Sequence, residues 1–210
     1  MKFQVEITDA LLIIDVQYDF CPGGSLAVPE ADGIIPNINA LSARFKHVIL
    51  TQDWHPEGHK SFASAHAGKK PFETTELAYG TQVLWPDHCV QGTKGAEFHD
   101  ALDTQRAGLV IRKGMNLEID SYSAFFENDR TTSTGLAGYL KALGVKRVVL
   151  CGIVAEYCVG YSGLDGLAEG FDVVLVEDAI ARFGGPDHDK MAKSLADKGA
   201  TFVMSEVLAG

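Results

Sequence analysis

The stretch from Arg147 to Cys158 limits the possible folds of this chain more than any other. Residues 148–150 form an apolar, partly β-branched run without polar alternation, which is typical of a strand buried on both faces of a sheet. Gly152 ends the run, and from Glu156 onward the spacing of apolar residues favours a helix. A buried strand followed by a helix is the repeating unit of a parallel sheet, so the rest of the chain must supply neighbouring strands.

The same alternation of strands and helices runs along the chain. Strands are expected at residues 10–16, 47–53, 109–114, 147–153, 172–178 and 201–204, and helices at 30–46, 134–143, from 156 onward and at about 187–198. Residues 54–107 are rich in Gly, Pro, His and aromatic residues and show weak periodicity, which indicates a long functional insertion. We therefore expect an α/β fold with a doubly wound, mainly parallel six-stranded sheet and helices on both faces.

Composition narrows the class of protein. The chain has 210 residues, of which 46% are hydrophobic and 22% charged, and this fits one globular domain over residues 1–210. A net charge of −10 without a basic cluster argues against nucleic-acid binding. No apolar run has the length of a membrane span or the character of a signal peptide. The four cysteines form no Cys-x-x-Cys pair, so we expect reduced thiols and a cytoplasmic location.

Four ionisable residues follow the predicted strands: Asp15, Asp53, Lys113 and Cys158. In open parallel sheets, sites form outside the carboxyl ends of the strands. A buried strand has no structural use for a charge at its end unless that charge is paired. Each residue alone could be a helix cap or a surface charge, but the four together favour a functional site.

Cys158 is the candidate nucleophile of this site. It is expected in the first turn of a helix, where unpaired N–H groups and the helix dipole lower a thiol pKa and can hold an oxyanion. The alternative is that Cys158 is a small buried hydrophobic residue, as most single cysteines are.

A metal site is indicated by Asp53 and His55, which project to the same side of an extended chain. A further histidine would complete a site with mixed nitrogen and oxygen ligands, which suits zinc, iron or manganese, with zinc preferred. His88 is favoured because the Trp-Pro before it is stiff, and His59 is the competitor. Both histidines lie in the expected insertion at about 54–107.

Several motifs, taken in order, resemble the isochorismatase-like cysteine hydrolases, and most closely their bacterial nicotinamidase (pyrazinamidase) subgroup. They are Asp15-Val-Gln-x-Asp19-Phe20, Asp53-Trp-His55-Pro, His59-Lys-Ser-Phe-Ala, Trp85-Pro-x-His88-Cys-Val-Gln-Gly, Arg112-Lys113-Gly, Ile119-Asp120-Ser-Tyr122-Ser-Ala-Phe-Phe126 and Tyr157-Cys158-Val. Any one motif is weak, but the ordered set is specific and extends from about Leu12 to the C-terminus.

The resemblance implies an amidase that converts nicotinamide, or pyrazinamide, to the acid and ammonia through a thioester, as in NAD salvage. It also implies one divalent transition metal, a homo-oligomer and the following site. The catalytic residues would be Asp15, Lys113 and Cys158, with the N–H groups of Ala155 and Cys158 as the oxyanion hole and a cis peptide between Val154 and Ala155. The metal ligands would be Asp53, His55 and His88, and the substrate ring would lie among Phe20, Trp85, Tyr122 and Val154.

The chain departs from the subgroup at Val154-Ala155-Glu156, where Ala-Thr-Asp is usual, and at Gly160, just after the nucleophile. Three other functions stay open. The chain could act on another small amide, carbamoyl or ureido substrate. It could be a hydrolase whose metal-bound water attacks, with Cys158 merely structural. It could also be a non-enzymatic binding protein, against which the intact acid, lysine and cysteine set argues.

Overall fold

The computed structural model describes residues 3–208. Its strands are β1 (Asp9–Ile14), β2 (His47–Asp53), β3 (Thr74–Leu77), β4 (Gly80–Val83), β5 (Leu109–Lys113), β6 (Arg147–Ile153), β7 (Asp172–Ala181) and β8 (Thr201–Val203). Its α-helices are α1 (Ile35–Ser42), α2 (Leu136–Ala142), α3 (Cys158–Ala168) and α4 (Pro186–Asp197). The ends of the expected domain, residues 1–2 and 209–210, lie outside the described residues.

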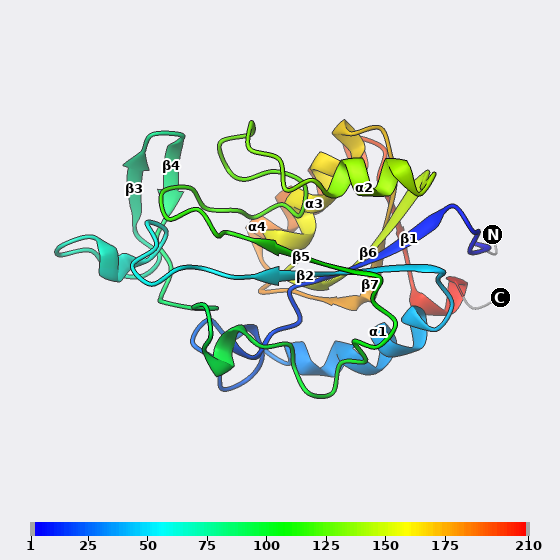
Figure 1. Ribbon diagram of the computed structural model, residues 1–210, viewed down its shortest axis with the longest axis horizontal. Coiled ribbons are helices and arrows are strands. Elements are labelled where there is room, and N and C mark those ends of the chain that lie inside the picture. Colours follow the sequence, from blue (N-terminus) through cyan, green and yellow to red (C-terminus); the bar gives the residue numbers. More distant parts are fainter. Residues whose placement is uncertain (1–2, 209–210) are drawn as a thin grey trace.

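All the described strands except β3 and β4 form one parallel, six-stranded sheet in the order β5-β2-β1-β6-β7-β8. The chain starts in the middle of the sheet and winds outward in both directions, so the predicted doubly wound α/β fold is confirmed (Figure 1). β1 and β6 are buried along nearly their whole length, which agrees with their lack of polar alternation.

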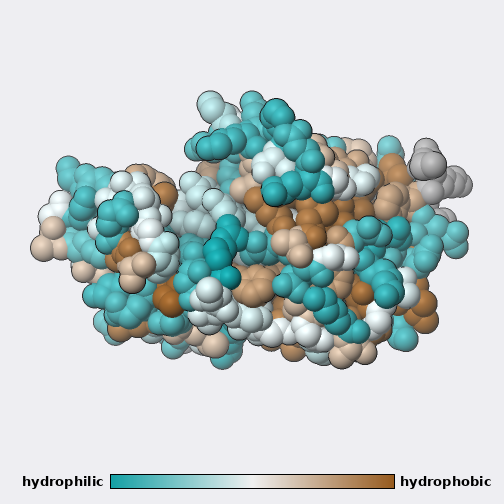
Figure 2. Space-filling model, turned by 90° about the horizontal axis from the view of Figure 1, so that it is seen from above, coloured by the Kyte–Doolittle hydropathy of each residue, from teal (hydrophilic) through white to brown (hydrophobic). Residues whose placement is uncertain are grey.

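Helices cover both faces of the sheet (Figure 1). On one face, α1 packs against side chains such as Leu11 and Ile13 of β1. On the other face, α2, α3 and α4 pack against Leu12 and Ile14 of the same strand. Alternate residues of one strand therefore serve two hydrophobic cores, as the period of two in a strand requires. Figure 2 looks down on the face with α2 and α3, where hydrophilic residues surround smaller hydrophobic areas.

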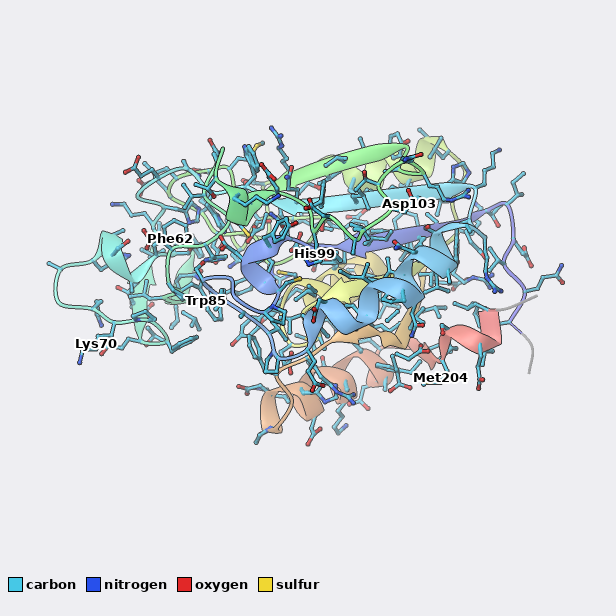
Figure 3. The ribbon with its side chains drawn as sticks, turned by 90° about the horizontal axis from the view of Figure 1, so that it is seen from below. Phe62, Lys70, Trp85, His99, Asp103 and Met204 are labelled. Carbon is cyan, nitrogen blue, oxygen red and sulfur yellow. The ribbon has the colours of Figure 1, made fainter. Side chains whose placement is uncertain are left out.

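The insertion extends beyond the carboxyl edge of the sheet and contains an antiparallel hairpin of β3 and β4 that the sequence did not predict (Figure 1). Figure 3 shows Phe62 and Trp85 where the insertion meets the sheet and Lys70 at its outer end. Phe62 and Trp85 form an isolated parallel bridge, which ties the insertion together beside the site.

The helix expected over residues 30–46 is shorter than predicted. A 3-10 turn covers Ala31–Ile34, and α1 begins at Ile35 with a proline in its first turn, a position that proline favours. Within residues 3–208, no helix has both the length and the apolar character that crossing a bilayer requires.

Candidate active site

The carboxyl edge of the sheet brings the four predicted ionisable residues together. Asp53 and Lys113 end β2 and β5 and are partners in the strand pairing. Asp15 directly follows β1, and Cys158 is the first residue of α3, which follows β6. Because β5, β2, β1 and β6 are consecutive neighbours in the sheet, the four side chains meet in one place.

Lys113 is the centre of this cluster. Its Nζ lies 2.9 Å from Asp15 Oδ2, 3.0 Å from Asp53 Oδ1 and 3.5 Å from Cys158 Sγ. It also donates a hydrogen bond to the Ser121 carbonyl oxygen at 2.9 Å. Burial lowers the pKa of Lys113, but the two carboxylates more than offset it and raise the pKa well above its usual value. Lys113 is therefore a buried ammonium that holds both acids beside the thiol.

Asp15 is positioned by Thr51, a residue that the sequence analysis missed. The Thr51 hydroxyl donates to Asp15 Oδ1 at 2.6 Å, and the Asp15 N–H donates to Thr51 Oγ1 at 3.1 Å. The only signal in the sequence was a hydroxyl directly after the apolar run Val48–Leu50 of β2. Burial raises the pKa of Asp15, although the charge of Lys113 opposes this. A raised pKa makes Asp15 a stronger proton acceptor than an ordinary aspartate.

The pKa of Cys158 differs from the expectation. Burial raises it well above the usual thiol value, and Asp15 and Asp53 raise it further, while Lys113 lowers it. A helix terminus was expected to lower this pKa, but the effect of a helix end is modest compared with burial beside two carboxylates. Cys158 is therefore a thiol whose proton faces a nearby base.

Two expectations for the loop before Cys158 are wrong by one residue. The cis peptide joins Ile153 to Val154, not Val154 to Ala155. The Ala155 N–H donates to the Ala181 carbonyl oxygen at 2.9 Å, which continues the pairing of β6 with β7, so it is already used and cannot also hold an oxyanion. The N–H groups of Val154 and Cys158 donate no hydrogen bond within residues 3–208.

The expected metal ligands also converge. Asp53 Oδ2 lies 3.0 Å from His55 Nε2 and 3.4 Å from His88 Nε2. The Nδ1 atoms of the two rings face the carbonyl oxygens of Gly114 and Pro86 at 2.9 and 2.8 Å. Because a carbonyl can only accept, each Nδ1 carries a proton, and in the neutral rings each Nε2 presents a lone pair to the carboxylate. Two nitrogen lone pairs and a carboxylate facing one another fit a divalent transition metal.

His59, the competing ligand, is engaged elsewhere. Its Nδ1 lies 2.7 Å from Ser61 Oγ, and its Nε2 lies 2.8 Å from the Asn116 carbonyl oxygen. A second group of possible ligands, made of His55, His59 and Asp120, is close enough to hold an ion. Since His59 uses both nitrogens within the protein, the set with His88 fits a metal better.

A cavity of about 30 Å³ opens above the Cys158 sulfur. All four residues predicted to bind the substrate line it, together with side chains that the sequence analysis did not assign. The lining consists of Phe20, Leu26, Val28, Asp53, Trp85, His88, Asp120, Ser121, Tyr122, Val154, Tyr157, Cys158 and Phe183. A larger cavity, between β7 and α4, contains neither the thiol cluster nor the metal-ligand set. The small cavity is therefore where a flat ring could meet both the thiol and the metal ligands.

Known proteins resemble this chain over most of its length. The isochorismatase domain model matches residues 9–207. A nicotinamidase from Acinetobacter baylyi is 55% identical over 170 residues, which cover 81% of this chain and 79% of that protein.

Two solved structures are also similar. A nicotinamidase and pyrazinamidase from Acinetobacter baumanii is 48% identical with a TM-score of 0.95, over 97% of this chain and 99% of that one. A pyrazinamidase from Pyrococcus horikoshii, solved in complex with zinc, is 37% identical with a TM-score of 0.78, over 94% of this chain and 99% of that one.

Proposed function

The chain belongs to the isochorismatase family, and from this premise we propose that it is a nicotinamidase, a hydrolase that converts nicotinamide to nicotinate and ammonia. One observation carries the proposal. Lys113 Nζ lies within 2.9 Å of Asp15 and 3.5 Å of the Cys158 sulfur, which faces an aromatic cavity. The similarity to the Acinetobacter baylyi nicotinamidase supports the same substrate.

In the first half of the reaction, Asp15 accepts the Cys158 thiol proton while the sulfur attacks the amide carbonyl carbon. The raised pKa of Asp15 suits it to this transfer. Lys113 stabilises the developing thiolate from 3.5 Å. When the carbon–nitrogen bond breaks, Asp15 returns the proton to the nitrogen, ammonia leaves, and the acyl group stays on sulfur as a thioester.

The tetrahedral oxyanion needs hydrogen-bond donors close to the sulfur. The N–H groups of Val154 and Cys158 flank the loop before α3 and have no acceptor within the described part of the chain. We assign the oxyanion hole to these two groups, in place of the expected pair with Ala155.

In the second half, a water molecule attacks the thioester carbon and gives its proton to Asp15. The carbon–sulfur bond then breaks, Asp15 gives that proton to the sulfur to restore the Cys158 thiol, and nicotinic acid leaves and loses its carboxyl proton to solvent as nicotinate. Asp15 thus acts first as base and then as acid in each half of the reaction, and Lys113 keeps it in place throughout.

Asp53, His55 and His88 would hold one divalent transition metal, and zinc is our first choice because of the zinc-bound pyrazinamidase. A bound metal would supply a Lewis-acidic contact for the ring nitrogen of the substrate. Phe20 and Trp85 would flank the ring, and Tyr122 and Val154 would close its sides. A homo-oligomer and a cytoplasmic location stay predictions.

Ammonia release tests the proposal directly. The purified protein, with its metal content measured on the same sample, is incubated with nicotinamide, pyrazinamide and a panel of ureido and carbamoyl amides. We expect equal amounts of ammonia and nicotinate from nicotinamide, and a kcat/KM for the two pyridine-like amides above that for the rest. Release from a ureido or carbamoyl compound but not from nicotinamide would contradict the assigned substrate.

A further inference from the structure

The cavity above Cys158 is tighter than the proposed substrate. Its volume is about 30 Å³, whereas an engineered protein cavity of roughly 150 Å³ holds benzene. Nicotinamide is a ring of benzene's size with a carboxamide attached. One wall of the cavity must therefore move before such a ring reaches the sulfur.

Phe183 is the lining residue best placed to move. Its side chain is 46% exposed, while Phe20 and Trp85 are each only 6% exposed. It lies in the short connection between β7 and α4 and is followed by Gly184 and Gly185, with φ of +82° and +79°. A Cβ at either glycine would meet no atom within 4 Å. Backbone conformation, not crowding, therefore explains the two glycines, and it gives this connection a point at which it can bend.

Glu156 fastens the same connection to the loop before the nucleophile. Its Oε1 accepts a hydrogen bond from the Gly184 N–H at 2.7 Å, and the side chain is 5% exposed. Its other oxygen, Oε2, is buried and has no hydrogen-bond partner within residues 3–208. The connection is thus held to Glu156 by a single hydrogen bond from a backbone N–H, a contact of modest net stability. The link can therefore break and re-form.

We propose that Phe183 is the movable wall of the substrate cavity and determines which ring substituents are accepted, and that Glu156 holds it in the closed position. This rests on the proposed function, since the size limit applies to its ring substrate. Phe183 is a specificity-determining residue and Glu156 a positioning residue, because Glu156 acts only through the backbone of Gly184. The sequence offered one clue, the departure from the subgroup pattern at 154–156.

Alkylation of Cys158 tests access without needing turnover. Iodoacetamide serves as the small reagent and N-phenylmaleimide as the bulky one, and intact mass follows each reaction. The other three cysteines are almost fully buried, and a Cys158→Ala sample shows whatever they contribute. Phe183→Ala should raise the rate ratio of bulky to small reagent at least about tenfold, as expected for a pocket contact of this size. The matched control is Leu143→Ala, which removes another partly exposed apolar side chain, 39% exposed, at the end of α2 and should leave the ratio unchanged.

Two variants test the hydrogen bond between Glu156 and the Gly184 N–H. Glu156→Ala removes the acceptor for the Gly184 N–H and should shift the ratio in the same direction as Phe183→Ala, but by less. Glu156→Gln keeps an acceptor oxygen and should restore the wild-type ratio, which a role in overall stability alone would not predict. An unchanged ratio in a folded Phe183→Ala protein would contradict the role of Phe183 as the movable wall of the cavity. A Glu156→Gln protein that behaves like Glu156→Ala would contradict the role of the hydrogen bond between Glu156 and Gly184.

Turnover gives the second readout. For nicotinamides with a bulky ring substituent, kcat/KM of Phe183→Ala should rise relative to nicotinamide itself, while nicotinamide shows a higher KM with little change in kcat. If the wild-type protein releases no ammonia from nicotinamide, the proposed function fails, and the alkylation ratios still decide for or against Phe183 as the wall.

Discussion

Lys113 and Asp53 form a buried ion pair at 3.0 Å that joins the thiol cluster to the metal-ligand set. One oxygen of Asp53 faces the ammonium, and the other faces His55 and His88. A single carboxylate therefore serves both halves of the site. Neighbouring strands make this possible, because Asp53 and Lys113 are register partners at the ends of β2 and β5.

Replacing Lys113 by Met should slow alkylation of Cys158 by iodoacetamide at neutral pH. The Lys113 ammonium opposes the burial and the two carboxylates that raise the pKa of this thiol, so its loss raises the pKa further. Each unit of that rise cuts the thiolate fraction about tenfold. Lys198→Met, which removes an exposed lysine, is the control. Alkylation at the wild-type rate in Lys113→Met would remove the role assigned to Lys113.

His88→Ala should leave the purified protein largely free of metal, while His59→Ala should keep it. His88 presents Nε2 to Asp53, whereas His59 uses both ring nitrogens for other contacts. Loss of a ligand should reduce metal affinity by at least the 10–100-fold typical of its supporting residues. Elemental analysis and metal titration measure this. Metal loss in His59→Ala alone would instead favour the set of His55, His59 and Asp120.

Gly114→Ala should weaken the metal site, although Gly114 is not itself an expected metal ligand. A Cβ at Gly114, whose φ is +65°, would lie 2.4 Å from His55 Cε1. The Gly114 carbonyl also accepts from His55 Nδ1, so displacement of either group turns the ring away from Asp53. We expect a loss of metal affinity of about 10–100-fold, measured by titration. Gly138→Ala in α2, where a Cβ meets no atom within 4 Å, is the control.

The sheet and the four ionisable residues were predictable because their signals are local. Buried apolar runs mark strands, and the rule that parallel strands share a carboxyl edge places Asp15, Asp53, Lys113 and Cys158 together. The choice of His88 over His59 followed from local chain stiffness and the motif, and it stays a prediction that the metal analysis of the two variants tests.

The remaining features depend on contacts that sequence does not encode locally. The Ala155 N–H was misassigned because its acceptor is the carbonyl oxygen of Ala181, at the end of β7, and the pairing of β7 with β6 is a contact between segments distant in sequence. Thr51 lies two residues before the Asp53 motif, but its partner Asp15 is on a neighbouring strand, and Phe183 lies outside the motifs altogether. The pKa of Cys158 was misjudged because burial, which only packing reveals, outweighs the helix end.

The pH dependence of kcat/KM should report Asp15. The reaction uses its carboxylate form, so activity falls as pH drops through its pKa. Burial raises that pKa above the ordinary value of 3.8, and the loss should therefore begin at a higher pH than for an exposed aspartate. Rates from about pH 4 to pH 8 measure this, and Asp15→Asn should be inactive throughout. A profile that stays flat down to about pH 4 would contradict Asp15 as the base.

Turnover of nicotinamide by Cys158→Ala tests covalent catalysis most directly. Removing one sulfur from a buried site should leave the fold and the metal content intact, which thermal unfolding and elemental analysis check on the same sample. We predict that ammonia release falls by at least roughly 10³-fold relative to the wild-type protein, because no other cysteine of residues 3–208 lines the cavity. Appreciable turnover by a folded, metal-containing Cys158→Ala protein would contradict the mechanism and favour direct attack by water.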